Sequence, residues 1–171
     1  PELTGRILGR KLVGGTLAVF VALGAFRVAT QFPGRDLPMD DWLNRHGADT
    51  PGYPCAAAEF VARNIRPTDG RLINEFTWGG YLAWRLGDRF QVLMDGRTQL
   101  YARDFWQDLC LGDQITARDR LSTVRADAAI LPLEKSRLSG ALRELKWKEV
   151  YRDDRAVVLV PSGSALAGAA D

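Results

Sequence analysis

Two apolar runs with a short helix-like segment between them constrain the fold of this chain more than any other feature. They are residues 71–76 and 90–95, within the stretch RLINEFTWGGYLAWRLGDRFQVLMDGRTQLY that covers residues 71–101. The first run ends in Thr77-Trp78-Gly79-Gly80-Tyr81 and the second in Asp95-Gly96-Arg97. If the two strands are parallel neighbours, both turns lie at the carboxyl edge of a sheet, where open α/β sheets bind their ligands.

The rest of the chain extends this alternation of strands and helices. A helix is predicted from Pro54 to about Ile65, and Thr77 is positioned to cap the helix between the two runs. The later pattern predicts helical pieces at 104–111 and 113–124, the second capped by Asp113, and a strand at 128–131. It then predicts a helix capped by Ser136 and strands at 147–151 and 156–160.

These elements predict an α/β fold with flanking helices around a small, predominantly parallel sheet. The run at 90–94 is apolar enough for a strand buried on both faces. The last two strands are predicted to form an antiparallel hairpin. Its apolar strand, 156–160, belongs inside the sheet, and its charged strand, 147–151, belongs at the edge.

Residues 12–26, LVGGTLAVFVALGAF, contain no charged side chain. This stretch reaches the roughly 20 residues of a membrane span if it extends to Phe32 and Arg27 turns its guanidinium toward the membrane surface. Basic residues at positions 6, 10 and 11 precede it. The positive-inside rule therefore predicts a cytoplasmic flank, an extracytoplasmic location after Phe32, and the lipid bilayer as a partner.

Two other interpretations of this stretch stay open. A signal peptide has the same basic flank with a shorter apolar core, and Ala22-Leu23-Gly24 fits its small-x-small cleavage site. A buried helix of a soluble domain is the other interpretation, because three glycines weaken the helix. Since the chain begins with Pro1 rather than Met, we expect a fragment or a processed chain.

The predicted organisation has four parts. They are a flank and transmembrane helix (1–32), a connector rich in Pro, Gly and Asp (33–54), an extracytoplasmic α/β domain (55–161), and a disordered tail of small residues (162–171). A length of 171 residues suffices for one modest domain with a core. The formal net charge of +2 gives no basis for a nucleic-acid partner. Two cysteines, Cys55 and Cys110, either pair in an oxidising compartment or stay separate buried thiols.

The glycine turn is the first candidate binding feature. Glycines in the first turn of a helix leave backbone N–H groups uncovered, and the helix dipole there favours a phosphate or a carboxylate. The spacing is not GxGxxG and no Walker lysine follows, so nucleotide binding is not supported. The structural alternative is that Gly79 and Gly80 allow a tight strand-to-helix turn against a neighbouring segment.

The turn Asp95-Gly96-Arg97 is the second candidate. Asp95 can accept from a sugar hydroxyl or bind a divalent cation, and Arg97 can hold a carboxylate or phosphate through two hydrogen bonds. In the structural alternative these two side chains pair with each other or with nearby backbone. The aromatic rings of Trp78 and Tyr101 either stack on a sugar or cover the core. The predicted ligand-binding set is Trp78, Gly79, Gly80, Tyr81, Asp95, Arg97 and Tyr101.

No catalytic constellation is visible in the sequence. The single histidine, His46, lies in the connector, and neither GxSxG nor HExxH occurs. Carboxylate pairs at 40–41 and 153–154 lie in predicted loops, where they are solvated charges. We therefore predict no self-contained catalytic site, and the sequence identifies neither a cofactor nor a metal.

Taken together, these motifs resemble those of a known class of proteins. A span with a basic flank, a connector, "strand–WGGY–helix–strand–DGR…Y" and a final DDRAVVLV are similar to the C-terminal part of polytopic bacterial membrane proteins of the GT-C class. The resemblance covers roughly residues 1–161. It implies a polyprenyl-phosphate sugar as donor, a glycan or peptide as acceptor, and catalytic carboxylates in loops nearer the N-terminus than this chain.

A second similarity links Thr77-Trp78-Gly79-Gly80-Tyr81 to the WWDYG motif of the oligosaccharyltransferase catalytic subunit, which contacts the acceptor peptide. Thr77 stands here for the first Trp of that motif, and Gly79 for its Asp. The resemblance thus implies an accessory domain on the acceptor side of a membrane glycosyltransferase. The alternative is a membrane-anchored binding or interaction module without enzymatic activity.

Overall fold

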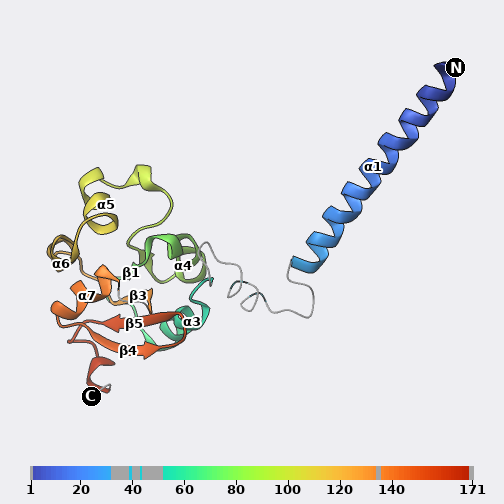
Figure 1. Cartoon of the computed structure of the whole chain (residues 1–171). Coiled ribbons are helices and arrows are strands. Elements are labelled where there is room, and N and C mark those ends of the chain that lie inside the picture. The colour runs from blue at the N-terminus through green and yellow to red at the C-terminus, as the bar shows by residue number, and fades with distance from the viewer. Residues whose placement is uncertain (1, 32–38, 40–42, 44–51, 134–135, 170–171) are drawn as a thin grey trace. The chain divides into compact units, whose positions relative to one another are not determined.

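The computed structural model describes residues 2–31, 39, 43, 52–133 and 136–169 (Figure 1). The chain divides into two compact units, Pro1–Trp42 and Leu43–Asp171. The first contains the helix α1 (Glu2–Gln31), and the second contains a five-stranded sheet with helices on both faces. Most of the predicted connector, with Trp42 and His46, lies outside the described residues.

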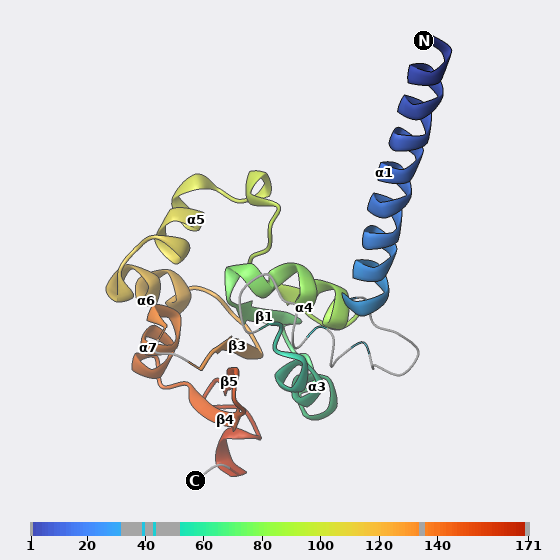
Figure 2. The same cartoon turned by 45° about the vertical axis from the view of Figure 1, so that its right-hand side comes forward.

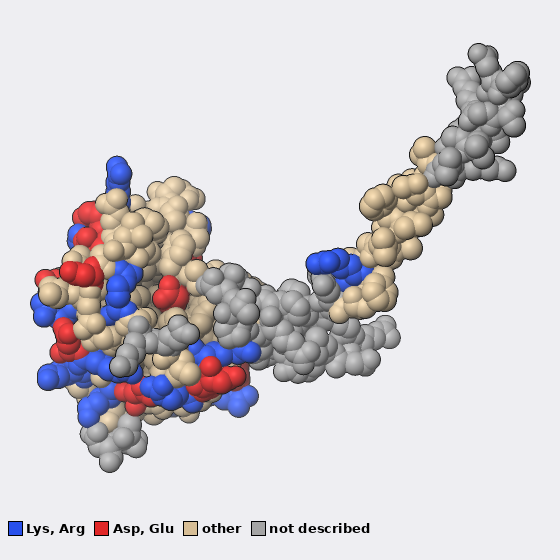
Figure 3. All heavy atoms as spheres, viewed as in Figure 1, with Lys and Arg blue, Asp and Glu red and all other residues tan. Residues whose placement is uncertain are grey.

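Helix α1 is apolar and buries nothing. Its segment Val13–Thr30 has a mean hydropathy of 1.7, and none of its side chains is buried within the structure. Val13, Phe20 and Phe26 are each 69% exposed. In Figure 3 the described part of α1 is almost entirely tan, whereas charged residues of both signs are interspersed over the visible face of the α/β unit. By length and composition α1 can cross a membrane, as predicted, and a signal sequence has the same properties.

The sheet is mixed, so the prediction of a predominantly parallel sheet is wrong. Its strands are β1 (Arg71–Asn74), β2 (Gln91–Val92), β3 (Ala128–Pro132), β4 (Lys148–Arg152) and β5 (Ala156–Val160), in the order β2-β1-β3-β5-β4. Strand β1 runs parallel to β2 and β3, whereas β5 runs antiparallel to β3 and β4. The C-terminal hairpin is confirmed, with β5 inside and β4 at the edge. Because its inner strand also pairs antiparallel with β3, half of the strand pairings are antiparallel.

The helices form one layer on each face of the sheet. Successive strand residues such as Leu72 and Ile73 point to opposite faces and belong to two separate core clusters. Helices α3 (Cys55–Asn64) and α4 (Gly79–Leu86) pack on the face of Leu72. Helices α5 (Arg103–Cys110), α6 (Gln114–Ser122) and α7 (Arg137–Glu144) pack on the face of Ile73 (Figures 1 and 2).

Two details near β1 and β2 differ from the predictions. Strand β2 has only two residues and lies at the edge of the sheet, and Gln91 is exposed, so it is not buried on both faces. Thr77 does not cap α4, because it lies within the 3-10 helix η1 (Phe76–Trp78), which Glu75 caps. The predicted caps at Asp113 and Ser136 are confirmed, since both side chains accept a hydrogen bond from a backbone N–H of the first turn.

The segment after β5 packs on the domain. Residues 162–169, which the sequence predicts to be disordered, form turns and the 3-10 helix η3 (Ala167–Ala169). Ala167 is buried in the core cluster that contains Leu72, and Leu166 packs against that cluster. Two apolar side chains near the end of the chain are therefore part of the fold, although their small neighbours carry no strand or helix pattern.

Candidate functional site

The structure brings the two predicted turns together. Strands β1 and β2 are parallel neighbours, and the first residue of α4, Gly79, faces the backbone of Met94 and Asp95. A Cβ atom placed on Gly79 would lie 2.0 Å from the carbonyl oxygen of Met94 and 2.7 Å from Cα of Asp95. The space beside Gly80 is open. Gly79 therefore allows the close approach of two backbones, whereas Gly80 leaves the helix start uncovered.

Asn74, which the sequence analysis missed, joins the two strand ends. It is fully buried at the end of β1, and its side-chain nitrogen donates to the carbonyl of Met94 at 2.7 Å. Its side-chain oxygen accepts from the backbone N–H groups of Leu93 (3.0 Å) and Met94 (3.3 Å). The only sequence signal was an amide residue directly after apolar Leu72 and Ile73, where a buried polar side chain needs partners.

The aromatic rings of Trp78 and Tyr81 lie in the core. Each residue is 6% exposed, and the ring of Tyr81 stacks on Tyr53 with 4.8 Å between centroids. Tyr53 comes from the end of the predicted connector. The exposed ring of this helix belongs instead to Trp84, which is 67% exposed. In this structure Trp78 and Tyr81 therefore pack in the core.

Asp95, Arg97 and Tyr101 form a hydrogen-bonded group at the second turn. The side chain of Asp95 is 6% exposed and accepts from the backbone N–H of Arg97 (2.9 Å), from its Nε (2.9 Å) and from its Nη2 (2.5 Å). The hydroxyl of Tyr101 donates to Asp95 at 3.1 Å and accepts from the backbone N–H of Asp95 at 3.0 Å. The group fixes the turn and the direction of the Arg97 side chain.

The charges of this group follow from its contacts. Hydrogen bonds from the Arg97 side chain lower the pKa of Asp95, and burial only partly opposes them. Burial raises the pKa of the Tyr101 hydroxyl, and the Asp95 carboxylate beside it acts in the same direction. At neutral pH Asp95 is therefore an anion whose oxygens are already occupied, and Arg97 is the member of the group that reaches solvent, with 64% of its side chain exposed.

A hollow of about 610 Å³ lies beside this group. Its walls are the end of α4, the edge strand β2 and the segment around η2 (Thr98–Leu100), from which Arg97, Leu100 and Tyr101 line it. Leu100 is 65% exposed. Of the predicted residues, Arg97 and Tyr101 thus face this hollow, whereas Trp78 and Gly79 are buried beneath the turn.

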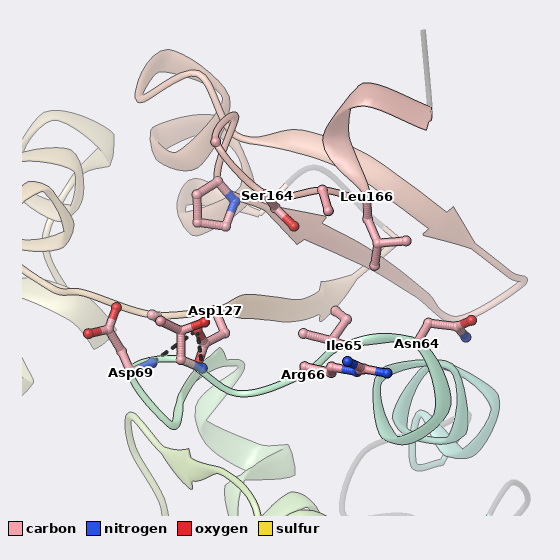
Figure 4. A pocket seen from close by; sticks show the side chains of 12 residues that line it. Asn64, Ile65, Arg66, Asp69, Asp127, Ser164 and Leu166 are labelled. Carbon is pink, nitrogen blue, oxygen red and sulfur yellow. Dashed lines mark hydrogen bonds between the residues drawn. The ribbon is translucent and has the colours of Figure 1, made fainter.

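A second hollow, of about 620 Å³, lies at the other end of the sheet (Figure 4). One wall is the turn before β1, and the opposite wall is the segment after β5 with Ser164 and Leu166. The Asp127 carboxylate accepts from the backbone N–H groups of Thr68 (2.9 Å), Asp69 (3.1 Å) and Gly70 (2.8 Å). The backbone N–H groups that an anionic ligand would need thus already donate to the Asp127 carboxylate.

The two cysteines are free thiols on opposite faces of the sheet. Cys55 is buried in the core cluster of α3 and α4, and Cys110 packs against the other cluster, with its sulfur 3.9 Å from that of Met94. Burial raises the pKa of the Cys110 thiol. Within the part of the chain that the structure describes, no three His, Cys, Asp or Glu side chains gather as metal ligands.

Neither a protein-family model, nor a curated protein, nor a solved structure matches this chain.

We predict opposite effects for alanine at the two adjacent glycines. Gly79→Ala should lower the free energy of unfolding by about 1–3 kcal/mol, because its Cβ overlaps the backbone of Met94. Gly80→Ala should be neutral or stabilising by up to about 1 kcal/mol, since alanine is the better helix former and the space is open. Urea unfolding of both variants measures the difference; equal effects would contradict the close approach at Gly79.

We also predict a pH-dependent cost for Asp95→Asn. Because the pKa of Asp95 is lowered in the folded state, its charge stabilises the fold above the unfolded pKa, and that contribution is lost as pH falls through the folded pKa. The variant should be about 1–3 kcal/mol less stable at pH 7, and the gap should narrow below about pH 4. Thermal unfolding from pH 2 to 7 tests this; a gap independent of pH would show that the charge contributes nothing.

Proposed function

We propose that this chain is part of a GT-C-like membrane glycosyltransferase, which takes sugar from a polyprenyl-phosphate donor, and that its α/β unit is the accessory domain on the acceptor side. The catalytic residues lie outside this chain. The observation that carries the proposal is the placement of Arg97 at the rim of the hollow beside β2. Buried Asp95, which is itself hydrogen-bonded to Tyr101, holds Arg97 there.

The geometry of Arg97 suits an acceptor or an anionic group. Its Nε and Nη2 are bound to Asp95, so the guanidinium is already oriented while most of the side chain faces solvent. An oriented guanidinium binds a carboxylate, a phosphate or a sugar hydroxyl with little further loss of side-chain freedom. Leu100 adds an exposed apolar surface to the same rim, against which a sugar ring or a peptide side chain can pack.

The first unit supports a location at a membrane. Its helix α1 exposes every large apolar side chain of the segment Val13–Thr30, and a lipid environment removes that surface from water. The donor in the proposed reaction carries a polyprenyl chain and therefore lies in the bilayer. A domain joined to such a helix stays at the surface where that donor is used.

We predict that α1 is retained and that the α/β unit faces away from the cytoplasm. A fusion of alkaline phosphatase after Asp171 should be active in bacteria, and a green fluorescent protein at the same place should be dark. Mass spectrometry of the purified chain should find residues 12–26 still attached. An active cytoplasmic reporter would reverse the topology, and a product beginning after Gly24 would identify a signal peptide instead.

We predict that Arg97→Ala lowers sugar transfer by the full-length protein about tenfold or more, since a hydrogen bond to a charged group contributes about 1.5–3 kcal/mol. The measurement is transfer of labelled sugar from the polyprenyl-phosphate pool of membrane vesicles, at several acceptor concentrations. Most of the loss should appear in KM for the acceptor. Arg63→Ala, which removes a 75% exposed side chain of α3 outside the hollow, is the matched control and should transfer normally.

Two results would count against this function. Equal loss of expression and folding in Asp95→Ala and Arg97→Ala would show that the turn is structural only. Binding of glycans or peptides by the purified protein, lost in Arg97→Ala but without sugar transfer by the full-length protein, would favour the membrane-anchored binding module.

A further inference from the structure

Strand β2 forms one edge of the sheet, and part of its backbone is unpaired. The N–H of Gln91 donates to the carbonyl of Gly70 at 2.7 Å. The N–H of Leu93 donates to the carbonyl of Leu72 at 2.8 Å. In a parallel ladder every second residue turns its N–H and C=O toward the same neighbour, so Val92 points away from β1. Within the described residues, neither the N–H nor the C=O of Val92 has a hydrogen-bond partner.

The opposite edge of the sheet is protected against pairing with another chain, whereas this edge is not. Strand β4 carries charges at Lys148, Glu149 and Arg152. Its register with β5 also shifts between Glu149 and Tyr151. Charged side chains and bulges are the usual features that keep an edge strand from pairing. The segment 90–94, FQVLM, has no charge, and the pairing of β2 with β1 is regular. Only the short length of β2 limits pairing here, so side-chain contacts must add to it.

The hollow of about 610 Å³ lies beside this edge and has walls from both helix layers. Residues 90–93 line it from the sheet. Ala83 lines it from α4 and packs against the core cluster of Leu72. Tyr101 lines it from the opposite layer and packs against the cluster of Ile73. A strand added beside β2 would therefore lie between walls on both of its faces, as the existing strands do.

The charged side chains of the hollow give no preference for a charged ligand. Arg97 is paired with Asp95. Both terminal nitrogens of Arg89 donate to carbonyls at the carboxyl end of α3. Asp88, the acidic residue of the lining, is exposed to solvent. The hollow offers a ligand the apolar surface of exposed Leu100 and the unpaired backbone of the edge strand.

We infer that an extended peptide segment with uncharged side chains binds in this hollow as an additional strand of the sheet. The N–H of Val92 donates to a carbonyl of the segment, and the C=O of Val92 accepts from one of its N–H groups. Successive side chains of a strand point to opposite faces, so they reach Ala83 on one side and Leu100 and Tyr101 on the other. A sugar offers neither this backbone pattern nor this alternation. The binding does not depend on sugar transfer; only the identification of the peptide as the acceptor rests on the proposed function.

The amide of Val92 provides the readout. An array of short acetylated and amidated peptides, built from uncharged residues and rich in Val, Ile and Thr, is screened against the full chain in detergent micelles. The tightest member should bind saturably, with a Kd below about 1 mM. By NMR of the free chain, the Val92 amide should exchange with deuterium faster than the amides of Gln91 and Leu93, which donate within the sheet. That peptide at ten times its Kd should slow exchange at Val92 about tenfold.

Two changes test the backbone pairing. In the peptide, N-methylation of one amide should weaken binding about tenfold, because the Val92 carbonyl loses its donor, and N-methylation of either neighbouring amide should not. In the protein, Val92→Pro removes the N–H that points away from β1 and should weaken binding about tenfold. Val92→Ala, which also reduces core packing but keeps the N–H, is the matched control and should bind normally. Circular dichroism checks that each variant is folded, and the peptide series keeps the test valid if Val92→Pro is not.

Three outcomes would overturn the inference. The first is an array without any member that binds more tightly than about 1 mM. The second is equal tolerance of N-methylation at every position, which would indicate a site that reads side chains alone. The third is a dimeric chain whose Val92 amide exchanges slowly without peptide, which would assign the edge to a second copy.

The proposed function is judged by a different measurement, the transfer of sugar in membrane vesicles. Peptide binding with the expected N-methylation pattern but no sugar transfer would count against the proposed function and leave this inference standing. Sugar transfer to a glycan without any peptide binding would do the reverse.

Discussion

The carboxyl ends of β1 and β2 are held together by one buried amide. The backbone of Asn74 pairs with Ile130 of β3, while its side chain binds Leu93 and Met94 beyond the end of β2. Strand β2 itself contributes only two residues to the ladder, so this side chain continues the pairing where the backbone does not. Losing the amide would leave buried N–H and C=O groups without partners, which costs more than the bonds themselves contribute.

The position of the candidate site depends on that connection. With Met94 fixed, α4 can start against it at Gly79, and Asp95 is placed where it can hold Arg97 at the rim of the hollow. Glu75 directly follows Asn74, and its side chain caps η1, the short helix that leads into α4.

Sequence patterns predicted most of the elements, because apolar periodicity and helix caps are local signals. The hairpin, the caps at Asp113 and Ser136, and the neighbouring parallel strands β1 and β2 are confirmed. The mixed sheet was not predicted, because the partner of β5 is settled by packing between distant segments. In the candidate site, the sequence left two interpretations of Asp95 and Arg97: ligand binding, or pairing with each other or with nearby backbone. The partners of Asn74, 19 and 20 residues away, and of Asp127, at least 57 residues away, leave no local pattern.

Asp127 also constrains the sheet, through its three hydrogen bonds to the turn at 68–70. That turn immediately precedes β1, and Asp127 immediately precedes β3, so the carboxylate locks the starts of the two central strands to each other. Asn74 ties the far end of β1 to Met94. The chain from Met94 through α5 and α6 to Ala126 therefore leaves the sheet at one anchored point and returns to it at another. Lengthening such an excursion adds little closure entropy, so residues inserted between α5 and α6 should cost the paired strands little free energy.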